Sequence, residues 1–287
     1  MAETMTPAPQ RVPGEPGPLA LLGKLTPRDR AILRVLADHD VLTTAQIAEL
    51  EFGSLRHAQT RLATLAALGA VGRFRRRLAY GSEPWRYRLA PAGAALVAAE
   101  RGQRPPAPRL VERRALALAA SPRLDHLLGV NGFFTALAAA ARASGGACTL
   151  AAWLSEQQCA ARFGDLARPD GYGAWACGQH VTGFFLEYDN GTETTTRVAG
   201  KLAGYADLAT SENAPVLVLF WLPAPAREAA VRRPLARALS GAVMAATGTP
   251  ALGGPAGPVW LPIGAGRRVP LTGLTPLAAP QIGRGVN

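Results

Sequence analysis

Residues 55–77 read LRHAQTRLATLAALGAVGRFRRR and join a regular helical pattern to a run rich in arginine. Apolar side chains recur here at steps of three and four residues, which places them along one side of a helix. These side chains are Leu55, Ala58, Leu62, Leu65 and Leu68. Gly69 stands where a glycine commonly ends a helix. The stretch therefore predicts a helix over about 55–68 and an arginine-rich strand over 71–78.

Two more helices are expected before this stretch, and the second strand of a hairpin after it. Thr26-Pro27 and Thr43-Thr44 are typical helix starts, with a capping hydroxyl and, in the first case, a proline at the first helical position. Strand-like residues 85–89 follow a turn-forming segment. Three short helices and a hairpin predict a winged helix-turn-helix DNA-binding domain over 24–104, after a Pro- and Gly-rich disordered leader at 1–23.

The polar side of the 55–68 helix predicts how this domain contacts DNA. In a helix-turn-helix, the second helix of the motif directs its N-terminal side chains at base edges, where Arg and Gln can bind bidentately. The expected base contacts, with a phosphate contact for the last residue, are Arg56, His57, Gln59, Thr60 and Arg61. On the wing, the residues expected to meet the backbone or the minor groove are Arg73, Arg75, Arg76 and Arg77. The alternatives are ordinary solvated faces, or a winged domain that contacts protein.

The charge distribution agrees with a polyanionic partner. The net charge is +11, which favours double-stranded DNA over a membrane surface. Residues 1–110 hold 16 basic and 9 acidic side chains, a balance of +7, whereas residues 111–287 hold 15 and 11, a balance of +4. The shorter N-terminal part thus carries the larger excess.

A second domain is expected after the proline-rich residues 105–108, which predict a linker over 105–120. The predicted domain spans 121–264, and residues 265–287 are expected to form a poorly ordered tail. Its expected elements are a helix to about Arg142, strands at 149–154, 171–176 and 182–189, a helix at 196–208, a strand at 215–222, a helix at 226–239 and a strand at 259–263. This order predicts a mixed sheet. The whole chain is expected to be a two-domain α+β or α/β protein.

Carboxylates gather at two of these strands. Asp170 begins one, and Glu187 and Asp189 end the next, where alternation puts both on one face. If the strands pair as a hairpin, Asp170 comes beside Glu187. Carboxylates this close repel unless a cation holds them, and Mg²⁺ prefers such oxygen ligands. Asp170, Glu187 and Asp189, with Glu156 as an extra ligand, are therefore the expected metal site. The alternative is that Pro169-Asp170-Gly171 and Asp189-Asn190-Gly191 are simply turns.

Pro169-Asp170, a 16-residue spacer and Glu187-x-Asp189 resemble the PD-(D/E)xK nuclease motif. The resemblance implies a restriction-endonuclease-like αβββαβ domain with Asp170 and Glu187 as catalytic residues. This chain has Asp189 where that motif has its lysine. Lys201, on the following helix, is expected to supply the ammonium group instead.

The chain also resembles the replication-relaxation family of plasmids and mobile elements, over roughly residues 25–225. The resemblance rests on Leu25-Thr26-Pro27-Arg28-Asp29, on Leu124-Asp125-His126 leading into Asn131, on Arg168-Pro169-Asp170-Gly171, and on residues 185–193, FLEYDNGTE. It implies a role in replicating the element or relaxing its DNA.

Three functions are compatible with these patterns. The first is a DNA-binding protein whose second domain is non-catalytic or weakly catalytic, which the missing lysine after Glu187 favours. The second is a Mg²⁺-dependent DNA-nicking endonuclease. The third is a transcriptional regulator whose second domain binds protein or dimerises. Expected partners are double-stranded DNA and replication or conjugation proteins of the same element, with homodimerisation left open.

Cysteine usage and hydropathy bear on the compartment. Cys148, Cys159 and Cys177 are irregularly spaced, which argues against a disulfide framework and forms no second pair for a zinc site with His180. No apolar run reaches the roughly 18–20 residues of a membrane-spanning helix, and no secretory signal pattern is present. We therefore expect a cytoplasmic protein without membrane association.

Overall fold

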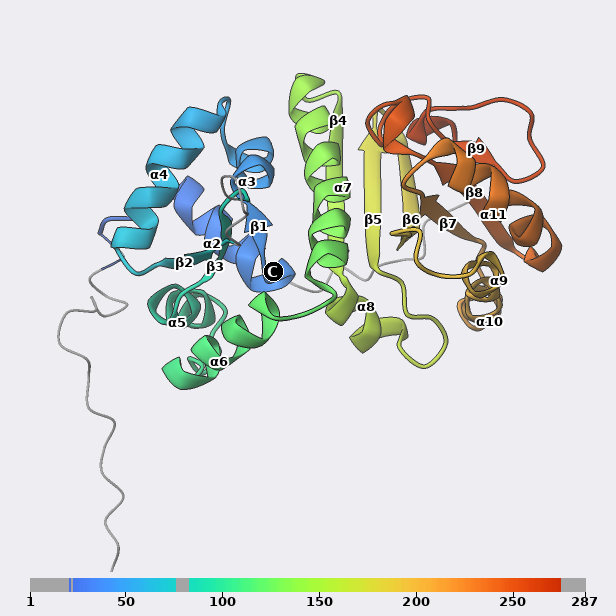
Figure 1. The fold of residues 1–287 in the computed structure, drawn as a ribbon. Coiled ribbons are helices and arrows are strands. Elements are labelled where there is room, and N and C mark those ends of the chain that lie inside the picture. The colour runs from blue at the N-terminus through green and yellow to red at the C-terminus, as the bar shows by residue number, and fades with distance from the viewer. Residues whose placement is uncertain (1–20, 22, 76–82, 275–287) are drawn as a thin grey trace, which may run out of the picture. The chain divides into compact units, whose positions relative to one another are not determined.

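The computed structural model describes residues 21, 23–75 and 83–274, and these fall into two units, Met1–Ser121 and Pro122–Asn287 (Figure 1). Most of the expected leader and the end of the expected tail lie outside the described residues. In the described part of the expected tail, Leu271 and Leu274 are buried and contribute to the core of the second unit, whereas most of residues 265–273 are exposed.

The first two helices described in full in unit 1 begin where the sequence predicts. α2 (Pro27–His39) starts at a capping box in which Thr26 and Asp29 exchange hydrogen bonds, and α3 (Thr44–Glu51) starts at another formed by Thr43 and Gln46. Each box satisfies backbone N–H groups that the first helical turn leaves without a partner. The remaining elements of the unit are α4 (Leu55–Ala67), α5 (Pro91–Glu100), α6 (Pro108–Ala119) and the strands β1 (Leu42–Thr43), β2 (Val71–Phe74) and β3 (Arg86–Leu89).

The three strands of unit 1 form a small antiparallel sheet in the order β1-β3-β2. Val71 pairs with Leu89 and Phe74 with Arg86, which confirms the predicted pairing of the two strand-like segments. The predicted apolar side of α4 is buried at Ala58, Leu62 and Leu65. Leu55 was also predicted to lie on this apolar side, and this was wrong, because Leu55 is the first residue of the helix and is 48% exposed.

The segment expected to be a linker is largely helical. α6 begins at Pro108, the last of the prolines from which the linker was predicted. Proline is well tolerated at the first helical position, since that residue has no intrahelical N–H bond to lose. The same residues that predict a boundary therefore also permit a helix start.

Unit 2 is built on a six-stranded mixed sheet in the order β4-β5-β6-β7-β8-β9. β6, β7 and β8 run parallel, and the other neighbouring pairs are antiparallel. The strands are β4 (Cys148–Ser155), β5 (Gly171–Cys177), β6 (His180–Tyr188), β7 (Val216–Trp221), β8 (Val243–Gly248) and β9 (Leu261–Pro262). The helices are α7 (Leu124–Ala143), α8 (Glu156–Phe163), α9 (Thr195–Gly200), α10 (Leu202–Ser211) and α11 (Pro225–Ala238), with short 3₁₀ turns η1 (Pro250–Leu252) and η2 (Leu271–Gly273).

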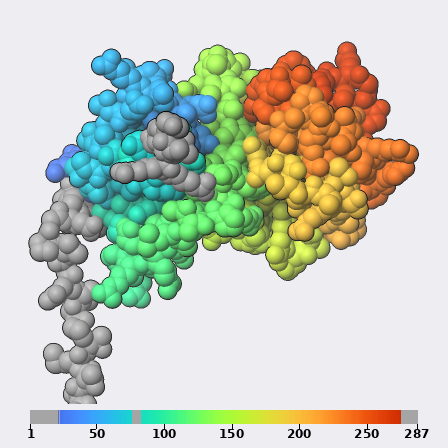
Figure 2. Space-filling view, in the orientation of Figure 1, coloured from blue at the N-terminus to red at the C-terminus, as the bar shows by residue number. Residues whose placement is uncertain are grey.

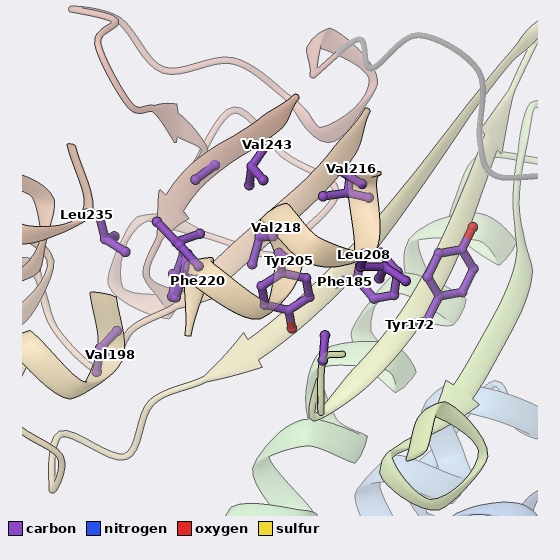
Figure 3. Packing of buried hydrophobic residues seen from close by; sticks show 14 of the residues in the cluster. Tyr172, Phe185, Val198, Tyr205, Leu208, Val216, Val218, Phe220, Leu235 and Val243 are labelled. Atoms are coloured by element: carbon purple, nitrogen blue, oxygen red, sulfur yellow. The ribbon is translucent and has the colours of Figure 1, made fainter. Parts of the chain in front are cut away.

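Apolar cores lie on both faces of this sheet. On one face α7 packs through Phe133, Phe134 and Leu137 against strand residues that include Phe184 and Leu219. On the other face α9, α10 and α11 cover the sheet (Figure 1). Figure 3 shows this second core, where the aromatic rings and branched side chains of neighbouring elements interlock. The chain thus has a mixed α+β architecture, with a sheet buried between helices in unit 2.

Unit 2 differs from the prediction in its secondary structure and in one disulfide. The sequence predicts neither β8 nor α8, and it predicts one helix over 196–208 where the structure has α9 and α10 separated at Lys201. The predicted absence of a disulfide is also wrong. Cys148 and Cys177 are directly paired across β4 and β5 and are joined as a disulfide, whereas Cys159 is free and buried.

One described helix, α7, has the length and composition that could cross a membrane, with 20 residues and a mean hydropathy of 1.2. One side of this helix packs on the sheet, where Phe134 and Leu137 are fully buried. Core helices of this kind satisfy the same length and composition test.

Candidate functional site

The β5–β6 hairpin brings the predicted carboxylates together. Gly171 pairs with Leu186, and the Asp170 N–H donates to the Leu186 carbonyl at 3.0 Å. Asp170 is thereby opposite Glu187 at the edge of the hairpin, close enough for its charge to raise the Glu187 pKa. The hairpin on which this juxtaposition depended is confirmed.

Glu187 is buried, and both of its carboxylate oxygens have a partner. Its Oε2 accepts from the Lys201 ammonium at 2.8 Å, and its Oε1 accepts from the Tyr205 hydroxyl at 2.5 Å. Burial, together with the nearby charge of Asp170, raises the pKa of Glu187 to about 7 even though Lys201 opposes the change. A buried carboxylate is tolerated only when it is paired or protonated, and here it has access to both forms.

Lys201 lies at the junction between two helices, where it is both the C-cap of α9 and the N-cap of α10. Its Nζ also contacts Glu193 Oε2 at 3.2 Å. Burial acts to lower the pKa of Lys201, but the hydrogen bond and charge of Glu187, with the charges of Asp170 and Glu193, outweigh burial and raise the pKa. The sequence predicted that this lysine would substitute for the absent one, and the structure places its ammonium against Glu187.

Asp170 is held from two sides. Its Oδ2 accepts the Tyr188 N–H at 2.8 Å, and its Oδ1 lies 2.9 Å from His126 Nε2 on α7. Burial acts to lower the pKa of His126, but the hydrogen bond and charge of Asp170 outweigh burial and raise it. Asp170 therefore joins α7 to the end of β6.

The other two predicted metal ligands are held elsewhere. Asp189 Oδ2 accepts from Arg227 Nε at 2.7 Å, and its Oδ1 accepts the Gly191 N–H at 2.6 Å, as expected of a turn residue. Glu156 binds the Arg123 guanidinium through both oxygens at 2.9 Å. In the described part of the chain, no group of three or more His, Cys, Asp or Glu side chains is arranged to hold a metal ion. Two of the four predicted magnesium ligands, Asp189 and Glu156, are therefore paired with arginines in this structure.

A cavity of about 470 Å³ opens beside this cluster. Its lining mixes cationic and anionic side chains, including Arg123, His126, Arg168, Asp170, Glu193 and Lys201. A polar cavity with balanced charge can admit a polar ligand, but it provides no strong net field for a free anion.

In unit 1 the predicted base-contacting residues lie on the exposed face of α4 (light blue in Figure 2). Arg56, His57, Gln59 and Thr60 are all exposed in its first two turns. Arg61 differs from them, because its Nε donates to the buried Asp29 at 2.9 Å and its Nη2 to the Lys24 carbonyl at 3.1 Å. Its guanidinium is therefore occupied in fixing α4 to the start of α2.

The predicted wing arginines are described only in part. Arg73 and Arg75 are exposed at alternate positions at the end of β2. Their guanidinium carbons lie 4.4 Å and 4.2 Å from the Trp85 ring centroid. Arg76 and Arg77 lie outside the described residues.

Apart from Lys201, the sequence did not predict the partners of the four carboxylates Asp170, Glu187, Asp189 and Glu156. These partners are His126, Tyr205, Arg227 and Arg123. His126 belongs to the Leu124-Asp125-His126 segment on which the family resemblance partly rests. That resemblance was the one feature of the sequence that could have pointed to His126 as a site residue. The arginines follow only from the tertiary fold, since they are 38 and 33 residues from the carboxylates that they bind.

A protein-family model described as replication-relaxation matches residues 33–216, more than half of the chain. The matched range includes Asp170, Glu187 and Lys201. Neither the curated proteins nor the solved structures contain a match to the chain. The match over most of both units shows that the chain belongs to the replication-relaxation family, with the role in plasmid or mobile-element replication or relaxation that the family suggests.

Proposed function

We propose that the protein binds double-stranded DNA through unit 1, acting as a winged helix-turn-helix, in the replication or relaxation of a plasmid or mobile element. α4 would enter the major groove with Arg56, His57, Gln59 and Thr60 at base edges. Arg73 and Arg75 would contact the backbone. The element context comes from family membership.

The proposal rests on the positions of the arginines in unit 1 that form no ion pair with a carboxylate. Six of its arginines are in ion pairs with carboxylates: Arg30, Arg34, Arg61, Arg86, Arg88 and Arg101. Among the described residues, no carboxylate is paired with Arg56, Arg73 or Arg75, nor with Arg28 or with Arg104, Arg109 and Arg113 on and before α6. Of these unpaired arginines, Arg56, Arg73 and Arg75 lie on α4 and at the end of β2, where their positive charge is available to DNA.

Salt-dependent DNA binding tests this proposal. Each phosphate contact lowers the slope of log K against log[salt] by about 0.9, so the full-length protein should lose affinity steeply between 50 and 200 mM NaCl. Arg56→Ala and Arg75→Ala should each weaken binding about fivefold or more, and Arg75→Ala should reduce the slope by about 1. Arg101→Ala is the matched control, because Arg101 is paired with Asp38. Equal losses in all three variants would contradict the assignment.

We further propose that unit 2 is non-catalytic or weakly catalytic. Glu187 is engaged by Lys201 and Tyr205, Asp170 by His126 and the Tyr188 N–H, and the remaining carboxylates by arginines. Such a satisfied network stabilises a buried site without requiring a metal. We therefore assign the cluster to holding β6, α7 and α10 together.

The second candidate is Mg²⁺-dependent nicking, which the 2.8 Å contact between Lys201 and Glu187 favours. Incubating supercoiled plasmid with the protein and Mg²⁺ or Mn²⁺ separates the two. Nicking that disappears in Asp170→Ala and Glu187→Ala, with DNA binding retained, would establish the enzyme. Absence of nicking by a preparation that binds DNA supports the non-catalytic assignment.

A further inference from the structure

Three arginines of unit 1 lie over aromatic rings. The guanidinium carbon of Arg28 is 5.1 Å from the centroid of Phe52, and those of Arg73 and Arg75 are 4.4 and 4.2 Å from the centroid of Trp85. A guanidinium group is attracted to a ring face at these distances. When a planar guanidinium group stacks on a ring, its edge N–H donors stay free, whereas an ion pair with a carboxylate uses them.

These three side chains have no carboxylate partner among the residues that the structure describes, unlike Arg34 on the same helix as Arg28, which binds Glu100. Their charges are thus held in place without being neutralised. A side chain held in place loses less conformational freedom when it binds a ligand.

The aromatic rings belong to fixed parts of the unit. Phe52 is buried directly after α3. The carbonyl of Trp85 accepts the Thr44 N–H at 3.1 Å, at the first residue of α3. Both rings are therefore tied to the helix that precedes α4.

Arg28 also lies beside the DNA-facing side of α4. It lines a cavity of about 550 Å³ with Phe52, Gly53, His57 and Thr60, and two of these are predicted base-contacting residues. The sequence pattern gave Arg28 no role in DNA binding. Its place at the N-terminal end of α2 puts a third free guanidinium next to the α4 face.

We infer that Arg28, Arg73 and Arg75 bind backbone phosphates of double-stranded DNA, and that Phe52 and Trp85 are positioning residues for them. The inference rests on the proposed DNA binding and deepens it. The ring under each guanidinium fixes its plane, so that the N–H edge is presented to a phosphate oxygen pair in the bidentate geometry that arginine favours.

Trp85 provides the direct test, because it is only partly buried and its backbone bond to Thr44 does not depend on the side chain. Trp85→Leu should weaken DNA binding about fivefold, the equivalent of losing about 1 kcal/mol of positioning. Trp85→Phe should restore affinity to within about twofold, since it retains a ring face. Thermal unfolding of each variant, followed by circular dichroism, verifies that the fold is kept.

Arg28→Ala and Arg34→Ala form a matched pair on α2, because each removes one positive charge. Arg28→Ala should reduce affinity about fivefold and lower the salt slope by about 1, whereas Arg34→Ala should leave both nearly unchanged. Folded Trp85→Leu protein with wild-type affinity, or equal effects of the two α2 variants, would overturn the inference. Wild-type protein that shows no salt-dependent DNA binding would instead overturn the proposed function itself.

Discussion

Glu187 illustrates how a single buried carboxylate depends on its neighbours. It is 3% exposed, and each of its oxygens accepts one hydrogen bond, from Lys201 and from Tyr205. Removing either donor would leave a buried acceptor without its partner, which typically costs about 1–3 kcal/mol. The two donors come from one short stretch at the start of α10, so the local course of that helix decides whether the carboxylate is satisfied.

The pH dependence of stability should report on Glu187. Its folded-state pKa of about 7 lies above the reference value of 4.5, so the folded protein binds this proton more tightly than the unfolded chain does. This contribution is fully present below pH 4.5 and is lost as the pH rises through about 7, and it amounts to on the order of 3 kcal/mol. Urea unfolding at pH 5, 6, 7 and 8 should therefore give a falling free energy of unfolding in the wild type.

Glu187→Gln should show a shallower fall over the same range, because glutamine does not titrate. His126 acts in the same direction in both proteins, since its pKa is also raised. Parallel pH profiles for wild type and Glu187→Gln would show that Glu187 keeps an ordinary pKa in the folded protein.

His126 offers an independent measurement at the same site. Its pKa is raised above 6.5 because the hydrogen bond and charge of Asp170 outweigh its burial. In Asp170→Asn the burial remains and the charge is gone, so the pKa should fall below 6.5. NMR titration of the His126 ring protons measures this change. Asp189→Asn is the matched control, because that carboxylate binds Arg227 and should leave the His126 titration where it is.

At the scale of elements, the sequence predicted those segments whose own side chains determine them. α2 and α3 begin at threonine capping boxes, and β7 is a continuous apolar run, so each could be predicted from local pattern. β8 reads Val-Met-Ala-Ala-Thr-Gly, and its alanines and glycine have little intrinsic preference for strands. It forms because β7 offers a parallel partner, which no local pattern reveals.

The residues of the candidate site also differ in whether local sequence or the tertiary fold determines their positions. Asp170 beside Glu187 could be predicted because one hairpin fixes both, and hairpin pairing is a local property. Lys201 could be proposed but not placed, since the break between α9 and α10 depends on tertiary packing. Arg227, which holds Asp189, could not be predicted, because α11 reaches that turn only through the fold of the whole unit.

Packing between α7 and β6 predicts the effect of one glycine. A Cβ atom at Gly129 would come within 2.4 Å of the Tyr188 ring, whereas one at Gly200 would meet nothing within 4 Å. Gly129→Ala should therefore destabilise the protein by about 1–3 kcal/mol through overpacking. Gly200→Ala, in α9, should stabilise it by up to about 1 kcal/mol through helix propensity. Urea unfolding of both variants measures the difference, and similar effects would contradict close packing of α7 on β6.

At the scale of the whole molecule, the two proposed roles lie in different units. The exposed arginines and α4 belong to unit 1, and the carboxylate network belongs to unit 2, which has its own cores on both faces of the large sheet. The N-terminal part also carries the larger share of the net charge of +11. This separation favours DNA binding that is governed by unit 1 in the intact chain.

The separation can be tested in the full-length protein with two substitutions, one in each unit. Arg75→Ala should weaken DNA binding, whereas Glu187→Gln should leave the affinity within about twofold of wild type. In the double variant the free-energy changes of binding should add to within about 0.5 kcal/mol, as they do for independent sites. Fluorescence anisotropy with a labelled duplex at fixed salt measures all four proteins. A loss of affinity in Glu187→Gln alone, with the fold intact, would show that the carboxylate network also takes part in binding DNA. That result would favour the second candidate function, which the nicking assay tests directly.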